Sequence, residues 1–133
     1  MVTFDTNFIV RILVEDDPVQ SKVALNTWQL ALEASGEFLP KLVLAEVIWV
    51  LNVSYGFDHQ AIYGVVDALL RTDGLNAEDK SSVLATLEAY SKGNADFSDY
   101  MILELARIAE ALPVHTFDRR FAHHPDVTLI ESK

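Results

Sequence analysis

MVTFDTN, residues 1–7, is a short apolar run that ends in three polar residues, and this change sets the first step of the fold. The run Met1 to Phe4 predicts a buried strand, and Asp5-Thr6-Asn7 predicts the N-cap of a helix. The segment that follows carries a helical stripe of apolar side chains, namely Phe8, Ile9, Ile12 and Leu13. A strand that passes directly into a helix is typical of an α/β fold, and it places Asp5 at the carboxyl end of the first strand.

The rest of the chain repeats this alternation of strand and helix. Pro18 suits the first turn of a helix, and Gly36, Gly56 and Gly93 suit the positions where helices stop. The predicted helices cover residues 18–35, 42–55, 58–70, 79–91 and 97–111, with a helical turn at 119–123. The predicted strands cover residues 37–40, 75–76, 113–117 and 127–130. The sequence therefore predicts one α/β domain over residues 1–133, with a small, largely parallel sheet flanked by helices in an α/β/α sandwich.

Composition narrows the class of protein. Half of the 133 residues are hydrophobic, so a chain of this length can bury a core of its own. It has no cysteine, which removes disulfides, Cys-based zinc sites and a Cys nucleophile. The first twelve residues contain Asp5 and Arg11, unlike a signal peptide, and no stretch has the length of a membrane span. We expect a soluble, cytoplasmic protein that does not use a membrane as partner.

The net charge is −10, from 10 Lys and Arg against 20 Asp and Glu. Such a balance argues against broad binding of a phosphate backbone, which needs a basic surface. An acidic protein can still act on nucleic acid if its carboxylates recruit cations that face the phosphates. The alternative is that the acid excess only keeps the protein in solution.

Five acidic residues occupy unusual positions. Asp5 and Asp118 each follow a predicted strand, so they are expected on the same edge of a parallel sheet, where ligands bind. Glu46 is the only charged residue between Lys41 and Asp58, and a buried lone carboxylate needs a partner. Asp96 and Asp99 are three residues apart at the start of a helix and share a face. Each also has a local alternative: helix N-cap, turn residue or, for Glu46, partner of a buried Arg or Lys.

Carboxylates gathered on one edge would repel each other and raise one another's pKa values. A bound divalent cation removes that repulsion, and oxygen ligands alone favour Mg²⁺ or Mn²⁺. Two such cations about 4 Å apart can promote in-line cleavage of a phosphodiester. One cation with a single carboxylate as base is the other possibility, and the residues leave both open.

Four motifs resemble those of the PIN-domain ribonucleases, and most closely the VapC-type toxins of bacterial toxin–antitoxin pairs. They are Phe4-Asp5-Thr6-Asn7, Val43-Leu44-Ala45-Glu46-Val47, Asp96-Phe97-Ser98-Asp99-Tyr100-Met101-Ile102 and Thr116-Phe117-Asp118. They run in order over essentially the whole chain, and together they are more specific than any one alone. The resemblance implies a PIN-like fold and a Mg²⁺- or Mn²⁺-dependent endoribonuclease that works as a homodimer and is blocked by a cognate antitoxin.

The resemblance also implies roles for individual residues. The acidic site residues would be Asp5, Glu46, Asp99 and Asp118, with Asp5, Asp99 and Asp118 as metal ligands. Asp96 would be an auxiliary ligand, because its counterpart in the family is not always acidic. Thr6, Asn7 and Thr116 match positions that tend to hydrogen-bond the carboxylates. The acid excess is a departure for a protein that cuts RNA, and it leaves room for a degenerate or non-toxic member.

Other enzyme classes fit the residues less well. A phosphatase of the haloacid-dehalogenase type would use Asp5 as nucleophile, but it needs a second aspartate two residues later, where this chain has Asn7. A catalytically inactive binding module would keep the acidic edge and cut nothing. No serine has a histidine partner in local sequence, and no glycine-rich phosphate loop occurs.

The remaining ring-bearing and basic residues favour structural or surface roles. His115 lies within a predicted strand and favours a core or edge position over a metal ligand, and His123-His124-Pro125 predicts an exposed loop. Trp28, Trp49, Tyr55 and Tyr63 fall at helical spacing, which favours core or dimer surface over base stacking. Lys41, Arg11, Arg119 and Arg120 lie near the proposed edge, where they would either contact phosphates or only solvate it.

Overall fold

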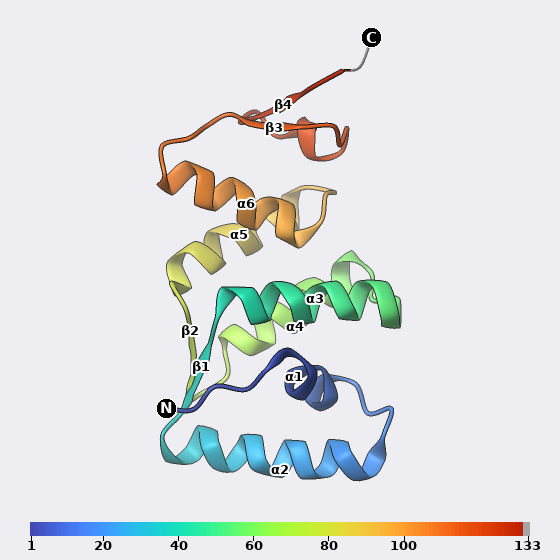
Figure 1. Ribbon diagram of the computed structural model, residues 1–133, viewed down its shortest axis with the longest axis vertical. Coiled ribbons are helices and arrows are strands. Elements are labelled where there is room, and N and C mark those ends of the chain that lie inside the picture. Colours follow the sequence, from blue (N-terminus) through green and yellow to red (C-terminus); the bar gives the residue numbers. More distant parts are fainter. Residues whose placement is uncertain (132–133) are drawn as a thin grey trace. The chain divides into compact units, whose positions relative to one another are not determined.

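A computed structural model of the protein describes residues 1–131. They fall into two compact units, Met1–Lys80 and a second unit that begins at Ser81. Figure 1 shows the order of helices and strands along the chain. Each unit pairs its short strands in parallel beside its helices, so the predicted α/β class is confirmed. The N-terminal unit holds α1 (Thr6–Leu13), α2 (Pro18–Ala34), β1 (Glu37–Leu39), α3 (Lys41–Tyr55), α4 (His59–Leu70) and β2 (Leu75–Ala77). The C-terminal unit holds α5 (Lys80–Lys92), α6 (Phe97–Ile108), β3 (Val114–Thr116), the 3₁₀ turn η1 (Phe121–His123) and β4 (Val127–Leu129).

Capping residues set the helix boundaries of the N-terminal unit. Asp5, Asp17 and Asp58 each accept a hydrogen bond from a backbone N–H in the first turn of the helix that follows. Gly56 ends α3 with a positive φ of 68°, a conformation that costs glycine little. These caps were readable from the sequence, and the helix starts agree with the prediction to within a residue or two.

The strands are shorter than predicted. β1 pairs with β2 over three residues, with Glu37 opposite Leu75, and β3 pairs with β4, with Val114 opposite Val127. The segment before Asp5 was predicted to be a buried strand, but Val2 makes a single parallel bridge to Glu37 and its side chain is exposed. That part of the prediction is wrong, because an apolar run alone does not supply the ladder partners that make a strand.

The C-terminal unit is organised around aromatic side chains. Tyr90 of α5 meets Phe97 and Tyr100 of α6 edge to face, with ring centroids 5.6 and 6.2 Å apart. Tyr100 in turn meets Phe121 of η1 at 5.8 Å. Edge-to-face pairs of this kind add to the stabilisation that burial of the rings provides. They join α5 and η1 to α6, the helix that Asp96 caps and that carries Asp99 in its first turn.

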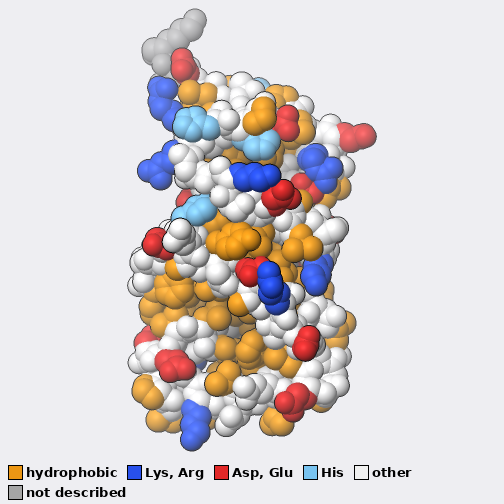
Figure 2. Space-filling model, turned by 180° about the vertical axis from the view of Figure 1, so that it is seen from behind, with side chains coloured by type: hydrophobic (Ala, Val, Ile, Leu, Met, Phe, Trp, Pro, Cys, Tyr) orange, Lys and Arg blue, Asp and Glu red, His pale blue; other side chains and the backbone are white. Residues whose placement is uncertain are grey.

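α3 differs from the buried helix that its sequence predicts. Leu42, Trp49 and Val53 are all exposed, with Trp49 64% accessible. With Glu46 they follow a four-three-four spacing, so they lie on one face of the helix. Figure 2 shows that apolar side chains also reach the surface in broad patches elsewhere on the chain. Among residues 1–131 no helix combines the length and apolar character needed to cross a bilayer.

The prediction of one domain over residues 1–133 stays a prediction.

Candidate acidic site

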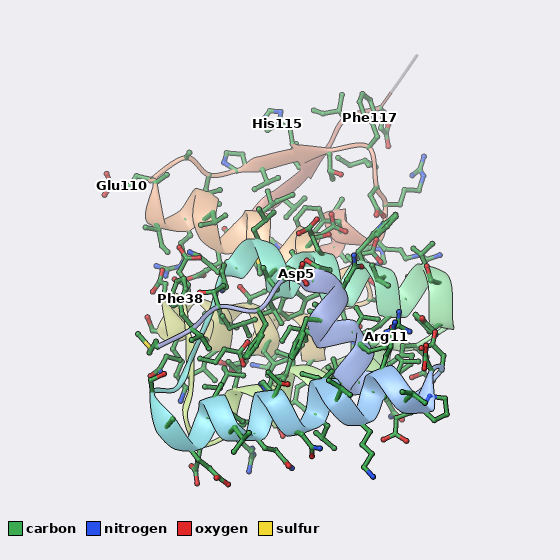
Figure 3. All side chains as sticks on the ribbon, turned by 60° about the horizontal axis from the view of Figure 1, so that its bottom comes forward. Asp5, Arg11, Phe38, Glu110, His115 and Phe117 are labelled. Carbon is green, nitrogen blue, oxygen red and sulfur yellow. The ribbon has the colours of Figure 1, made fainter. Side chains whose placement is uncertain are left out.

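Asp5 is exposed at the N-terminal end of α1, as Figure 3 shows. Its Oδ1 accepts a hydrogen bond from the backbone N–H of Phe8, 2.9 Å away, which makes Asp5 the N-cap of the helix. Its other carboxylate oxygen has no hydrogen-bond partner among the described residues. The predicted cap and the predicted ligand role are therefore compatible, because capping occupies one oxygen and leaves the other for a cation.

Thr6 and Glu46 connect α1 with α3. The Thr6 hydroxyl donates to Glu46 Oε1 at 2.9 Å. Glu46 was expected to be a buried carboxylate, but its side chain is exposed, and its partner is this hydroxyl rather than an arginine or lysine. An exposed carboxylate keeps its hydration and needs no ion pair. Because Thr6 directly follows Asp5 in the chain, this hydrogen bond holds the Glu46 carboxylate near Asp5 within the N-terminal unit.

A cavity of about 420 Å³ opens beside Asp5 between α1 and α2. Asn7, Phe8 and Arg11 line it from α1, and apolar residues of α2 close the other side. Asn7 makes no side-chain hydrogen bond to a carboxylate within the described residues. Arg11 forms a 2.7 Å ion pair with Asp16, so its charge is already compensated.

Asp99 is the most perturbed acid of the C-terminal unit. Partial burial raises the pKa of Asp99, and the negative charges of Asp96 and Asp118 raise it further. The Asp96 backbone N–H donates to Asp99 Oδ2 at 3.2 Å, and this bond acts in the opposite direction. The charges of Asp96 and Asp118 therefore act on Asp99, which lies in the first turn of α6, while Asp96 caps that helix and Asp118 follows β3.

Asp118 follows β3 as predicted and is held by its own turn. Its Oδ1 accepts from the backbone N–H of Arg120 at 2.9 Å and of Phe121 at 3.4 Å. The Thr116 hydroxyl accepts from the backbone N–H of Asp118 at 3.0 Å. Thr116 thus orients the aspartate through its backbone and not through its carboxylate.

The basic residues near these acids are mostly engaged. Lys41 lies 3.5 Å from Asp79, and Arg119 lies 3.9 Å from Glu131. Together with the Arg11 pair, these contacts leave Arg120 as the one member of the predicted basic set with no ion pair among residues 1–131.

The donor chemistry suits Mg²⁺ or Mn²⁺, because the candidate ligands supply only oxygen and their mutual repulsion rewards a cation. Within residues 1–131, however, no group of three or more carboxylate or histidine side chains is placed so that it could hold a metal ion. The ligand set Asp5, Asp99 and Asp118, with Asp96 as auxiliary, therefore stays a prediction.

Two features escaped the sequence analysis. Glu37 is fully buried at the start of β1, and its local sequence gives no sign of that burial. His124 is half-buried beside a second cavity, where an exposed loop was predicted. The cluster of two histidines and a proline after a helical turn was the available signal for the second feature.

Comparison with known proteins places the chain. The family model described as PIN domain matches residues 2–127. A protein of Aquifex aeolicus (strain VF5) named "VapC ribonuclease" is 25% identical over 121 residues, which cover 91% of this chain and 90% of that protein. The family match, residues 2–127, includes all four acidic motifs.

Proposed function

The chain belongs to the PIN-domain family, and from that premise we propose that it is a metal-dependent endoribonuclease that hydrolyses RNA phosphodiester bonds. We propose further that it is the toxin of a toxin–antitoxin pair, because a relative of similar length is named VapC ribonuclease. Family membership favours this function over the haloacid-dehalogenase alternative, which needs an acid where Asn7 stands.

The observation that carries the proposal is the crowding of carboxylates around Asp99. Burial raises the pKa of Asp99 most, and the charges of Asp96 and Asp118 raise it further, although Asp99 also serves the capping box of α6. Perturbed acids of this kind concentrate at functional sites. A divalent cation would convert the repulsion into ligation.

The proposed roles follow from the position of each group. Asp5, Asp99 and Asp118 hold the cation, with Asp96 as auxiliary ligand, and Glu46 takes up a proton during hydrolysis. When bound, Mg²⁺ or Mn²⁺ would stabilise the negative charge that develops on the phosphodiester. Supporting contacts come from three further residues: Thr6 orients Glu46, Thr116 orients Asp118, and Asn7 lies beside Asp5 in the cavity wall.

The partners form part of the same proposal. They are an RNA substrate, a cognate antitoxin protein that blocks the acidic site, and a second copy of the chain in a homodimer. The proposed compartment is the cytoplasm, where the RNA substrate is found. A protein without cysteine has no disulfide bonds that this reducing environment would break.

Metal-dependent cleavage tests the proposal directly. Purified full-length protein is incubated with total RNA and with structured RNA, in Mn²⁺ or Mg²⁺ and then in EDTA. The same reactions use Asp5→Asn and a matched control, Asp73→Asn, which alters an exposed aspartate in the same unit outside the proposed site. We expect internal cleavage that EDTA abolishes. Asp5→Asn should lower the rate by more than the roughly 10–100-fold that outer-shell partners contribute, whereas Asp73→Asn should leave it unchanged.

Each result decides something. Undiminished cleavage by Asp5→Asn would overturn the site assignment, and cleavage in EDTA would overturn the metal requirement. Intact RNA in every reaction, from protein freed of any bound partner by unfolding and refolding, would favour a binding module that keeps the acids without cutting.

A further inference from the structure

The C-terminal unit contains a cavity of about 240 Å³ that the acidic site does not use. Its walls come from the end of α5, the connection 93–94, Tyr100 of α6 and the loop 123–125. Pockets for drug-sized ligands usually measure roughly 300–1,000 Å³, so this one suits a single ring system. Figure 2 shows histidine side chains exposed among basic side chains on this unit.

Local contacts fix the polar groups of this cavity in advance. His124 Nδ1 accepts the backbone N–H of Asp126 at 3.1 Å, so the neutral imidazole carries its hydrogen on Nε2, which is left to donate. Tyr100 is only 4% exposed, and its hydroxyl accepts the Ala95 N–H at 3.2 Å. The described residues supply no acceptor for the hydroxyl's own hydrogen. A buried donor of this kind is costly unless a ligand or water receives it.

Gly93 makes room for that hydroxyl. A Cβ at position 93 would overlap the Tyr100 ring and hydroxyl, so any other residue would push the tyrosine out of place. The φ of Gly93 is not positive, and the glycine is therefore required here for close approach and not for backbone freedom.

The lining favours a nucleobase over a cation or an apolar peptide. No carboxylate lines the cavity within the described residues, although acids outnumber bases two to one in the chain. Two imidazoles and Pro125 offer rings, the buried Tyr100 offers its hydroxyl, and the Asn94 amide offers both a donor and an acceptor. Unstacked bases of single-stranded RNA are held by stacking on such rings and by hydrogen bonds along their edges.

The residues that line the cavity lie close in sequence to the acids of the proposed site. Asn94 lies two residues before Asp96, and His123 lies five residues after Asp118. Resting on the proposed nuclease function, we propose that this cavity takes one unstacked base of single-stranded RNA next to the bond that is cut. Lys92, at the mouth of the cavity and 3.0 Å from Glu88, is available to the phosphate of that nucleotide if it exchanges its partner.

Binding is tested without cleavage. Full-length protein in EDTA is titrated with each of the four ribonucleoside 5′-monophosphates, with ribose 5-phosphate and with inorganic phosphate, while the imidazole NMR signals are followed. We expect saturable binding of at least one nucleotide, with shifts at His123 and His124, and much weaker binding of the two compounds that lack a base.

Three variants locate the binding. His124→Ala removes a ring, and Ala89→Leu fills the cavity from α5 without changing a polar group. Each should weaken nucleotide binding roughly 5- to 150-fold, the value of one base stack. His115→Ala is the matched control, because His115 projects from β3 into solvent outside the cavity (Figure 3). Circular dichroism confirms that each variant is folded.

Equal binding of ribose 5-phosphate and nucleotides would overturn a base site, and so would unchanged binding by folded Ala89→Leu. RNA cleavage in Mn²⁺ without any nucleotide binding would refute the proposed base-binding role of this cavity and leave the proposed nuclease function standing. Nucleotide binding by a protein that cuts no RNA would support base binding in the cavity and refute its proposed position next to a bond that is cut. With both intact, Ala89→Leu should lose the nucleotide preference at one position beside the cut.

Discussion

Replacement of Glu37 by glutamine should change how the stability of the protein depends on pH. The side chain is 0% exposed, and its Oε1 accepts the Trp28 indole N–H at 2.7 Å. Its Oε2 is buried without a hydrogen-bond partner among the described residues. Burial raises the pKa of Glu37 above the ordinary 4.5, and the indole hydrogen bond offsets only part of the rise.

The sign follows from proton linkage. Because the folded protein keeps the proton of Glu37 to a higher pH than the unfolded chain, this group favours folding most below the unfolded pKa. Its contribution is lost as the pH rises from there to the folded pKa, and it is constant above. The slope over that interval approaches about 1.4 kcal/mol per pH unit, and the total loss is about 1.4 kcal/mol for each unit of pKa shift.

The substitution also has a cost in unfolding free energy that does not depend on pH. The test is therefore the slope of unfolding free energy against pH, and not the stability at one pH. Glutamine still accepts from Trp28 but places an amide NH₂ where Oε2 was, and buried donors without partners cost about 1–3 kcal/mol. That cost does not vary with pH. The Glu37→Gln variant should therefore show a flatter profile whether it is more or less stable than the natural protein at pH 7.

Urea unfolding between pH 4.5 and 8 in EDTA, followed by circular dichroism and by Trp fluorescence, measures the profile. Glu33→Gln is the matched control, since Glu33 is an exposed glutamate of α2. The difference between the natural protein and Glu37→Gln should fall with rising pH, and Glu33→Gln should run parallel to the natural protein. Parallel profiles for Glu37→Gln as well would refute the assignment of a buried carboxyl with a raised pKa.

Three further changes have defined outcomes. Asp99→Asn should stabilise the metal-free protein in urea by relieving repulsion from neighbouring carboxylates, and a loss of stability would contradict that crowding. Gly93→Ala should cost about 1–3 kcal/mol in thermal or urea unfolding because its Cβ displaces buried Tyr100, whereas Gly64→Ala, in open space within α4, should gain about 1 kcal/mol. Thr6→Val removes the hydroxyl that holds the α3 carboxylate and should lower kcat with little change in unfolding free energy; an unchanged kcat would separate that hydrogen bond from catalysis.

Helix boundaries were predictable because their determinants are local. An aspartate before an apolar stripe, a proline in the first turn and a glycine after the last turn each act within four residues. The end of α6 shows where this fails. The helix was predicted to reach residue 111 but ends at Ile108, where Glu110 takes a positive φ of 56° ahead of Pro113. No side chain in the sequence signals that conformation, which glutamate rarely adopts.

Strand partners were less predictable because they lie far apart in sequence. Glu37 pairs with Leu75 across 38 residues, and nothing near either residue specifies that register. Burial is equally non-local. Trp49 belongs to an apolar helix yet is exposed, while Glu37 is charged yet buried, because both outcomes depend on which neighbours pack against the backbone.

The same distinction applies to the acids. Asp5 and Asp118 each cap the turn that follows them, as their local sequence allows, because a cap is a local property. The expectation that both follow strands of one parallel sheet is wrong for the described residues, because Val2 makes only an isolated bridge to β1 and β3 pairs with β4 in a separate sheet. Glu46 was singled out for a reason that the structure does not support, since it is exposed and needs no buried partner. What distinguishes it is a neighbour 40 residues away, the Thr6 hydroxyl that holds one of its oxygens.

The acid excess, which at first argues against a nucleic acid substrate, has a consequence for how RNA could be held. Arg11 and Lys41 are paired with aspartates, so the N-terminal unit offers little unpaired basic charge beside Asp5 and Glu46. A protein that bound RNA through lysine and arginine would leave such residues free to neutralise phosphates. In this unit, affinity for RNA would then come from cations gathered by the carboxylates and from contacts to bases. Both sources are compatible with a net charge of −10, because neither requires a basic surface.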